Sequence, residues 1–268
     1  MMLINGKAAT DLPISDRATQ YGDGFFTTAK IVEGEVQFWR DHVERLMLTS
    51  KALHIELPSV LDLFQEVQQL VQQHPDGVLK IMISRGQGGR GYSPAGCSKA
   101  TRVLSISELP SHYTQWQQTG IELAVCEQKI ASSPMLAGLK TLNRLEQVLL
   151  KREVELTGKE DGLVLAQDNT VVEATAANIF WYHQGTWYTP DLRQAGIKGI
   201  MRKQVLAACE RANMPCQQGQ YPLTDVLAAD AVFICNSLMG LVPVKQCQQQ
   251  SWTDFTAIQR LQKEMDYA

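Results

Sequence analysis

The fold of this chain is decided by the stretch Ala137-Gly138-Leu139-Lys140-Thr141-Leu142-Asn143-Arg144-Leu145-Glu146-Gln147. We interpret it as a loop that brings Lys140 to the start of a helix. Leu142, Leu145 and Leu149 recur at helical spacing, and Gly138 permits a turn ahead of the lysine. Burial among leucines disfavours the charged form of an amine, and a neutral amine attacks an aldehyde to form a Schiff base. An ordinary surface lysine at a helix start is the alternative.

The bulk properties exclude several classes of protein. The chain has 268 residues, 44% of them hydrophobic and 20% charged, which is enough to bury a full core. A net charge of -3 and the lack of a long apolar run lead us to expect no nucleic-acid partner and no membrane span. The six cysteines lack metal-binding spacing, and the first residues lack the apolar core of a signal peptide. We therefore expect a cytoplasmic protein that acts on a small molecule.

Strand and helix patterns alternate along the chain, so we expect an α+β protein with two domains. Residues 1–109 would form a small N-terminal domain that begins with an Asn5-Gly6 hairpin. Residues 110–118 carry turn chemistry around Pro110 and Ser111, and we place the linker there. Residues 119–268 would form the large C-terminal domain.

An amphipathic helix is predicted around residues 41–50, with Val43, Leu46 and Met47 on its buried face. Arg45 lies beside those apolar positions. Its stem could cover the edge of the apolar stripe, or its guanidinium could hold a phosphate group. The residues alone leave both readings open.

A glycine-rich turn, Arg85-Gly86-Gln87-Gly88-Gly89-Arg90-Gly91-Tyr92, follows a predicted strand. It lacks the final Gly-Lys-Ser/Thr of a nucleotide-binding P-loop, and no helix pattern follows it. Arg90 and Tyr92 are better suited to contact a carboxylate. A flexible and merely basic loop is the alternative.

The second half of the chain supplies further polar candidates. Glu173 lies in a predicted strand that could face either solvent or a ligand, and Asn178 begins the next one. Gly199 precedes a helix whose first amides, at Ile200 and Met201, offer an anion site. A lysine for an aldehyde, a carboxylate for a ring nitrogen, and helix-end amides with an arginine for a phosphate are together what pyridoxal phosphate requires.

From Asp16-Arg17-Ala18-Thr19-Gln20-Tyr21-Gly22-Asp23-Gly24-Phe25-Phe26-Thr27-Thr28 to Cys235-Asn236-Ser237-Leu238-Met239-Gly240-Leu241-Val242-Pro243-Val244, the chain resembles the fold-type IV pyridoxal-phosphate enzymes. This family includes branched-chain and D-amino-acid aminotransferases and aminodeoxychorismate lyases. The resemblance implies a small α/β N-terminal lobe and a larger C-terminal lobe with a mixed, barrel-like sheet and flanking helices. It also implies a homodimer.

The resemblance assigns roles to particular residues. Lys140 would hold the cofactor, Glu173 would face its ring nitrogen, and Asn178 would lie beside it. The phosphate would be bound by Arg45, by the amides of Ile200 and Met201, and by Ser237. Arg90 and Tyr92 would bind a substrate carboxylate. Either Lys140 or Thr28 would protonate a leaving group.

Within the family, the motifs Phe26-Thr27-Thr28, Ser84 to Tyr92, Leu139 to Val148 and Cys235-Asn236 are most similar to the bacterial lyases. This similarity implies elimination of pyruvate from 4-amino-4-deoxychorismate, which leaves 4-aminobenzoate for folate biosynthesis. A D-amino-acid or branched-chain aminotransferase is the first alternative. A catalytically inert protein that retains the cofactor site is the second.

Overall fold

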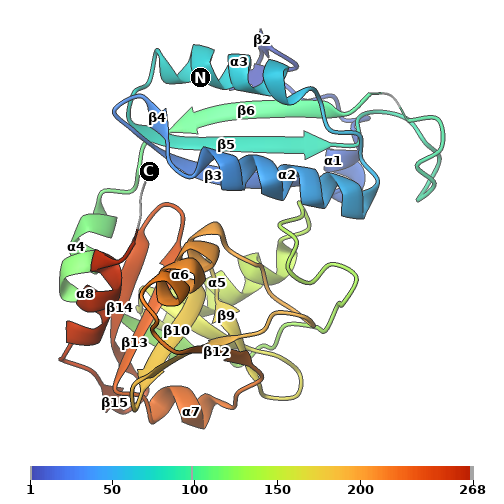
Figure 1. Ribbon diagram of the computed structural model, residues 1–268. Coiled ribbons are helices and arrows are strands. Elements are labelled where there is room, and N and C mark those ends of the chain that lie inside the picture. Colours follow the sequence, from blue (N-terminus) through green and yellow to red (C-terminus); the bar gives the residue numbers. More distant parts are fainter. Residues whose placement is uncertain (1, 98, 266–268) are drawn as a thin grey trace. The chain divides into compact units, whose positions relative to one another are not determined.

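The computed structural model describes residues 2–97 and 99–265, and its contacts divide the chain into two compact units (Figure 1). The first unit runs to Leu109 and also includes Lys140–Asn143. The second unit comprises Pro110–Leu139 and the chain from Arg144 onward. Among these described residues, no helix combines the length and the apolar character that crossing a bilayer requires.

The first unit is built on a six-stranded antiparallel sheet with the spatial order β2-β1-β6-β5-β3-β4. Asn5 and Gly6 both have positive φ, at 51° and 79°, which confirms the predicted hairpin between the first two strands. The strands are β1 (Met2–Ile4), β2 (Lys7–Ala8), β3 (Gly24–Val32), β4 (Glu35–Val36), β5 (Gly77–Ser84) and β6 (Thr101–Ser107).

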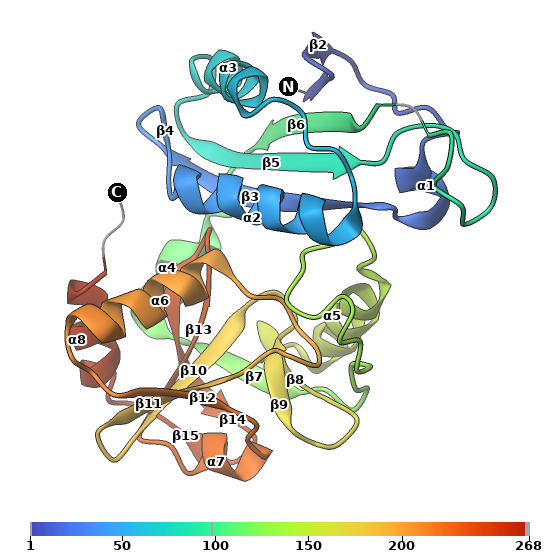
Figure 2. The ribbon, with the colours of Figure 1, turned by 45° about the vertical axis from the view of Figure 1, so that its right-hand side comes forward.

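Helices cover one face of this sheet. A short helix, α1 (Arg17–Tyr21), precedes β3, whereas α2 (Trp39–Leu53) and α3 (Val60–Val71) contribute to the same hydrophobic core as the strands (Figure 2). Alternate side chains of β3 point into this core, including Phe25 and Ala29. Phe26 and Thr28 therefore lie on the opposite face of the strand.

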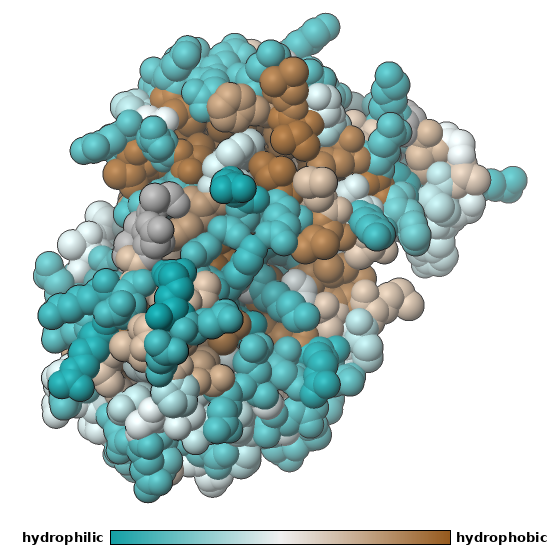
Figure 3. All heavy atoms as spheres, viewed as in Figure 1, coloured by the Kyte–Doolittle hydropathy of each residue, from teal (hydrophilic) through white to brown (hydrophobic). Residues whose placement is uncertain are grey.

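The predicted buried face of α2 was wrong. Leu46 is buried as expected, but Met47 is 54% exposed, and the other buried positions are His42 and Thr49. The error arose because the pattern was read from apolar residues alone. His42 can be buried because its Nδ1 lies 2.6 Å from the hydroxyl of Thr27. Figure 3 shows apolar side chains gathered on the visible surface of the first unit.

The second unit contains a curled, mixed sheet with the order β12-β11-β10-β13-β14-β7-β8-β9, and β15 pairs with β14. The pairs β11–β12, β7–β14 and β7–β8 are parallel, and the other pairs are antiparallel. The strands are β7 (Ile121–Val125), β8 (Asp161–Leu165), β9 (Val171–Ala174), β10 (Asn178–His183), β11 (Thr186–Pro190), β12 (Cys216–Gly219), β13 (Ala231–Asn236), β14 (Gly240–Cys247) and β15 (Gln250–Ser251).

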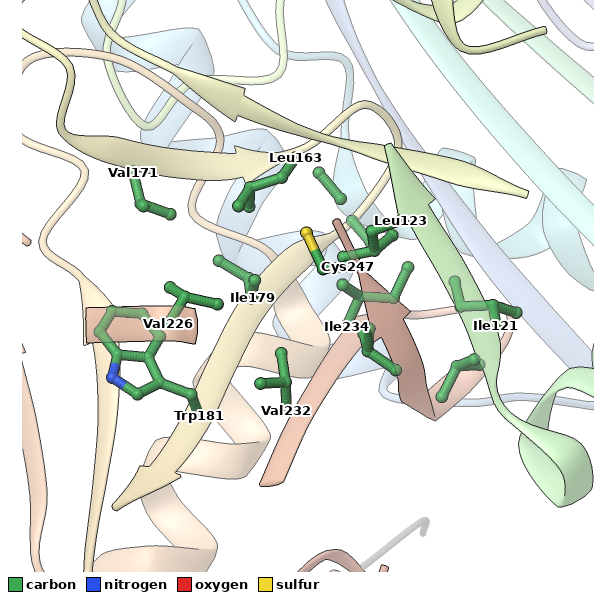
Figure 4. Close-up of a cluster of buried hydrophobic side chains, with 14 of the residues drawn as sticks. Ile121, Leu123, Leu163, Val171, Ile179, Trp181, Val226, Val232, Ile234 and Cys247 are labelled. Carbon is green, nitrogen blue, oxygen red and sulfur yellow. The ribbon is translucent and has the colours of Figure 1, made fainter. Parts of the chain in front are cut away.

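Side chains from six of these strands form one hydrophobic cluster (Figure 4). Ile179 and Trp181 of β10 meet Ile234 of β13 and Leu123 of β7 there. Burying a side chain of this size stabilises the fold by about 1.5–3 kcal/mol. The helices of this unit are α4 (His112–Thr119), α5 (Leu145–Thr157), α6 (Ile200–Arg211), α7 (Leu223–Leu227) and α8 (Thr256–Lys263).

The segment predicted as a linker, 110–118, contains most of helix α4. Tyr113 and Trp116, one turn apart, pack against the core cluster of the second unit. These aromatic contacts outweigh the turn-forming tendency of Pro110 and Ser111, which lie just before the helix. The domain boundaries at residues 109 and 119 stay a prediction from the sequence.

The predicted leucine face of the helix after Lys140 was also wrong. Helix α5 begins at Leu145, and its buried residues are Leu150 and Val154. Leu145 and Leu149 are 71% and 44% exposed. Both sides of α5 carry apolar residues, so helical spacing alone could not show which side faces the core.

Candidate active site

The segment that carries Lys140 is fixed to the start of β3 by backbone hydrogen bonds. The Phe26 N–H donates to the Lys140 carbonyl at 3.0 Å, and the Leu142 N–H donates to the Gly24 carbonyl at 3.0 Å. Gly24 is required at this point because a Cβ would clash with the Ile83 carbonyl and with Leu142. The lysine is therefore presented by a strand-like segment of the first unit.

The Lys140 amine lies over an aromatic ring. Its Nζ is 4.6 Å from the centre of the Phe26 ring, and the Nζ of Lys80 is 5.0 Å from the same centre. Thr28 projects from the same face of β3 as Phe26, and Lys80 is its register partner on β5. Neither Phe26 nor Lys80 was identified as a site residue from the sequence. The strand alternation and the single lysine within β5 could have indicated both.

Arg45 lies on α2, one turn after His42. Burial lowers the pKa of Arg45 to about 10, although the Asp41 carboxylate acts in the opposite direction. Burial, and to a lesser extent the charge of Arg45, lowers the pKa of His42 to about 3, so that imidazole is neutral at physiological pH. Arg45 is thus the charged member of this pair, in keeping with either of its predicted roles.

Arg90 and Tyr92 lie in the long connection between β5 and β6, and both are exposed, Tyr92 by 89%. The rings of Tyr92 and Tyr21 are in edge contact, with their centres 5.6 Å apart. The side-chain amide of Asn143 donates to the Tyr21 carbonyl at 3.0 Å. Tyr21 and Asn143, both missed from the sequence, therefore connect this loop to the lysine segment.

In the second unit, two buried polar side chains hold one loop. Glu173 is 4% exposed, which contradicts the solvent-facing reading, and its Oε2 accepts from the Ile197 N–H at 2.8 Å. Asn178 accepts from the Gly199 N–H at 3.0 Å and donates to the Ile197 carbonyl at 2.8 Å. The amide of Asn178 therefore shapes the backbone that leads into α6. Its predicted contact with a cofactor remains a prediction.

The start of α6 suits an anion. Gly199 is the N-cap residue and supplies no side chain to the helix, so the first amides, at Ile200 and Met201, are not capped by it. A Cβ at Gly199 would clash with the Asn178 side chain, which explains the glycine. Amides at a helix start, backed by the helix dipole, bind phosphate groups.

Ser237 lies in the turn between β13 and β14. Asn236 organises this turn, because its Oδ1 accepts from the backbone N–H groups of Leu238 and Met239, both at 2.9 Å. Its amide also donates to the Ala176 carbonyl at 3.1 Å, in the connection between Glu173 and Asn178. This role of Asn236 was not identified from the sequence.

The electrostatic surroundings of Glu173 include a cation. Burial lowers the pKa of Arg144, and the negative charge of Glu173 partly opposes that shift. Arg144 directly precedes α5. Glu173 and Arg144 therefore act on each other electrostatically within the second unit.

These residues fit a phosphorylated pyridine aldehyde. The first unit holds a lysine amine beside an aromatic ring, and the second holds a buried carboxylate and the uncapped helix start. The sequence profile of the amino-transferase class IV family matches residues 24–247. The chain belongs to this class IV family. Pyridoxal 5'-phosphate is the cofactor of the family, and the amine, the carboxylate and the helix-start amides that it requires are present in this chain.

Individual class IV proteins are similar to this one over nearly its whole length. The aminodeoxychorismate lyase of Vibrio harveyi is 40% identical over 91% of this chain and 90% of its own. The crystal structure of the 4-amino-4-deoxychorismate lyase of Pseudomonas aeruginosa has 34% identity and a TM-score of 0.94, covering 98% of this chain and 97% of its own. A hypothetical aminotransferase of Mycobacterium tuberculosis in its PLP-bound form shares the fold, at 16% identity and a TM-score of 0.87, with 98% and 96% coverage.

Proposed function

We propose that this protein catalyses the pyridoxal-phosphate-dependent conversion of 4-amino-4-deoxychorismate to 4-aminobenzoate and pyruvate, a step of folate biosynthesis. The observation that carries the proposal is the identity of 40% and 34% to two such lyases over at least nine-tenths of the chain. The Lys140 segment and the buried Glu173 supply the residue types that the chemistry requires.

The roles that we propose follow from the chemistry of the residues. Bound pyridoxal phosphate supplies an electron sink for the carbon that carries the substrate nitrogen. The Lys140 amine removes the proton from that carbon as general base. The bond between the neighbouring ring carbon and the ether oxygen then breaks, and the electron pair leaves with the oxygen. Lys140 or Thr28 protonates the departing group, which becomes pyruvate, while the ring becomes aromatic.

The remaining residues serve binding in this proposal. Glu173 stabilises a protonated ring nitrogen, and Asn178 supports the backbone beside it. Arg45, the Ile200 and Met201 amides and the Ser237 hydroxyl bind the phosphate. Arg90 and Tyr92 bind a substrate carboxylate.

The test is a product assay on purified protein loaded with pyridoxal phosphate. With 4-amino-4-deoxychorismate and no keto acid, the enzyme should release pyruvate and 4-aminobenzoate in equal amounts. A protein that forms neither product, but transfers an amino group from a D-amino acid or a branched-chain amino acid to a keto acid, would instead be an aminotransferase.

We also propose a homodimer located in the cytoplasm. The dimer is supported by large apolar side chains exposed along α5, where Leu145, Val148, Leu149 and Leu156 are 71%, 60%, 44% and 84% exposed. Exposed apolar surface of this kind marks interaction sites. Light scattering should give twice the chain mass, and Leu149→Glu should shift the protein toward monomer. A monomeric wild-type protein with full activity would contradict the dimer.

A further inference from the structure

Arg17 is a buried arginine that no step of the proposed reaction uses. It begins helix α1 and is only 3% exposed. Its Nε donates to the Asp23 carboxylate at 2.8 Å. This hydrogen bond raises the pKa of Arg17 against the effect of burial, so the guanidinium stays charged.

The other nitrogens of Arg17 face the loop that carries Arg90 and Tyr92. Nη1 donates to the Gly91 carbonyl at 3.0 Å and to the Ser93 carbonyl at 3.4 Å, and Nη2 donates to the Tyr92 carbonyl at 3.4 Å. Three successive carbonyls therefore turn toward one guanidinium. The adjoining side chains, including that of Tyr92, remain exposed.

Further contacts fix the same loop to α1. The Arg17 N–H donates to the Gly86 carbonyl at 2.9 Å, and the guanidinium carbon lies 4.7 Å from the centre of the Tyr21 ring, which contacts Tyr92. Gly89 has a φ of 74°, and a Cβ there would clash with the Ser93 carbonyl and crowd Arg17. The loop is thus shaped around the arginine.

We propose that Arg17 is a positioning residue that holds loop 88–97 so that Arg90 and Tyr92 are presented to a substrate carboxylate. The substrate part of this inference rests on the proposed function. The loop part does not, because it concerns backbone contacts within the first unit. Asp23 keeps the guanidinium oriented, and the three carbonyls transmit that orientation to the loop.

Arg85 provides a matched control. Its Nε and Nη2 donate to the Asp23 carboxylate at 2.8 and 3.1 Å, and its Nη1 and Nη2 also donate to the carbonyls of His54 and Leu53 and not to the loop. Arg17→Met and Arg85→Met therefore each remove an ion pair with the same carboxylate. Only the first also removes the loop contacts. Arg17→Lys keeps the positive charge but loses the planar array of N–H donors that a guanidinium provides.

The experiment is amide hydrogen exchange on the full-length protein, with circular dichroism to check folding. Arg17→Met should speed amide exchange within residues 88–97 by roughly tenfold, because a charge-assisted hydrogen bond is lost. Arg17→Lys should have a smaller effect on the same residues. Arg85→Met should leave the exchange of this loop within about twofold of wild type. If Arg17→Met does not fold, the exchange rates of Arg17→Lys and wild type are compared instead. If the folded Arg17 variant exchanges its loop amides at the wild-type rate, the proposal is overturned.

Kinetics add a second readout. Arg17→Met should raise the KM for 4-amino-4-deoxychorismate by roughly tenfold and change kcat less, because the reacting groups stay in place. Equal KM values for Arg17→Met and wild type would overturn the substrate part. If the wild-type protein forms no product at all, the proposed function fails, and the exchange data still decide whether Arg17 holds the loop.

Discussion

The residues that we propose for the site are held differently within the two units. In the first unit, the site residues are side chains on a strand face, a helix and a loop, and Thr28, Lys140 and Tyr92 are all at least partly exposed. In the second unit, Glu173 and Asn178 are almost completely buried and are bonded to the backbone of residues 197–199. The first unit thus offers reactive side chains, and the second offers a rigid arrangement of backbone amides.

This difference predicts that substitutions in the two units change activity and stability to different extents. A buried polar group left without its partner costs about 1–3 kcal/mol of folding free energy, whereas a partly exposed group can bond to water instead. Substitutions at site residues of the first unit should therefore reduce turnover and leave the fold intact. Substitutions in the second unit should reduce cofactor retention and stability together.

Lys140→Ala tests the first half of this contrast and should have the largest effect. Loss of the reacting amine should lower kcat by roughly a thousandfold or more, while the free energy of unfolding changes by less than about 1 kcal/mol. Lys80→Ala is the control, because Lys80 approaches the same Phe26 ring. Borohydride reduction and peptide mapping should place the cofactor on residue 140. A label on Lys80 would contradict the assignment.

Glu173→Gln tests the second half. The neutral amide removes the charge that we propose for the ring nitrogen and weakens the bond from the Ile197 N–H, so activity should fall about a hundredfold and stability by about 1–2 kcal/mol. Cofactor titration and urea unfolding measure the two effects. Glu160→Gln is the matched control, because Glu160 also accepts a backbone N–H, from Glu122 at 2.9 Å. If Glu173→Gln changed activity alone, the two units would not differ as described.

Gly199→Ala sharpens the contrast by changing only one methyl group. The added Cβ clashes with Asn178, so unfolding free energy and cofactor affinity should each fall by about 1–3 kcal/mol. In an Asn178→Ala background the same substitution should cost less, because the opposing side chain is gone. Additive effects of the two substitutions would show that the clash is relieved elsewhere.

Asp23→Asn should reveal a pH dependence in the first unit. Burial alone would raise the pKa of Asp23, but the hydrogen bonds from Arg85 and Arg17 hold it below its ordinary value of 3.8. The carboxylate therefore contributes stability above about pH 4, and that contribution is lost as pH falls through the folded pKa. Urea unfolding between pH 3 and 7 should show the wild type and the variant converging at acid pH. A constant difference would contradict this account.

Local sequence patterns predicted the strands well, because alternation and the Asn5-Gly6 turn are short-range features. Helix faces were predicted poorly. His42 is buried through a bond to Thr27, and Leu149 is exposed although it lies at helical spacing from Leu145. Both outcomes depend on which partners the fold brings near, and no window of sequence contains that information.

For the candidate site too, some features could be predicted from the sequence and others could not. The residue types needed for pyridoxal phosphate were recognisable in Lys140 and Glu173, since each belongs to a distinctive motif. Other polar groups, such as Asn236 and Arg17, hold segments of the two units that lie 60 and 74 residues away in the chain, at Ala176 and Gly91. Hydrogen bonds over such separations leave no periodic trace in the sequence.

The short segment Lys140–Asn143 belongs to the first unit, although the residues on both sides of it belong to the second. A ribosome completes the first 109 residues before it reaches this segment, so the start of β3 must wait for hydrogen-bond partners more than a hundred residues downstream. Closing a loop of that length carries an entropic cost that later contacts must offset. The Lys140 segment can therefore pair with the start of β3 only after slightly more than half of the chain has been synthesised.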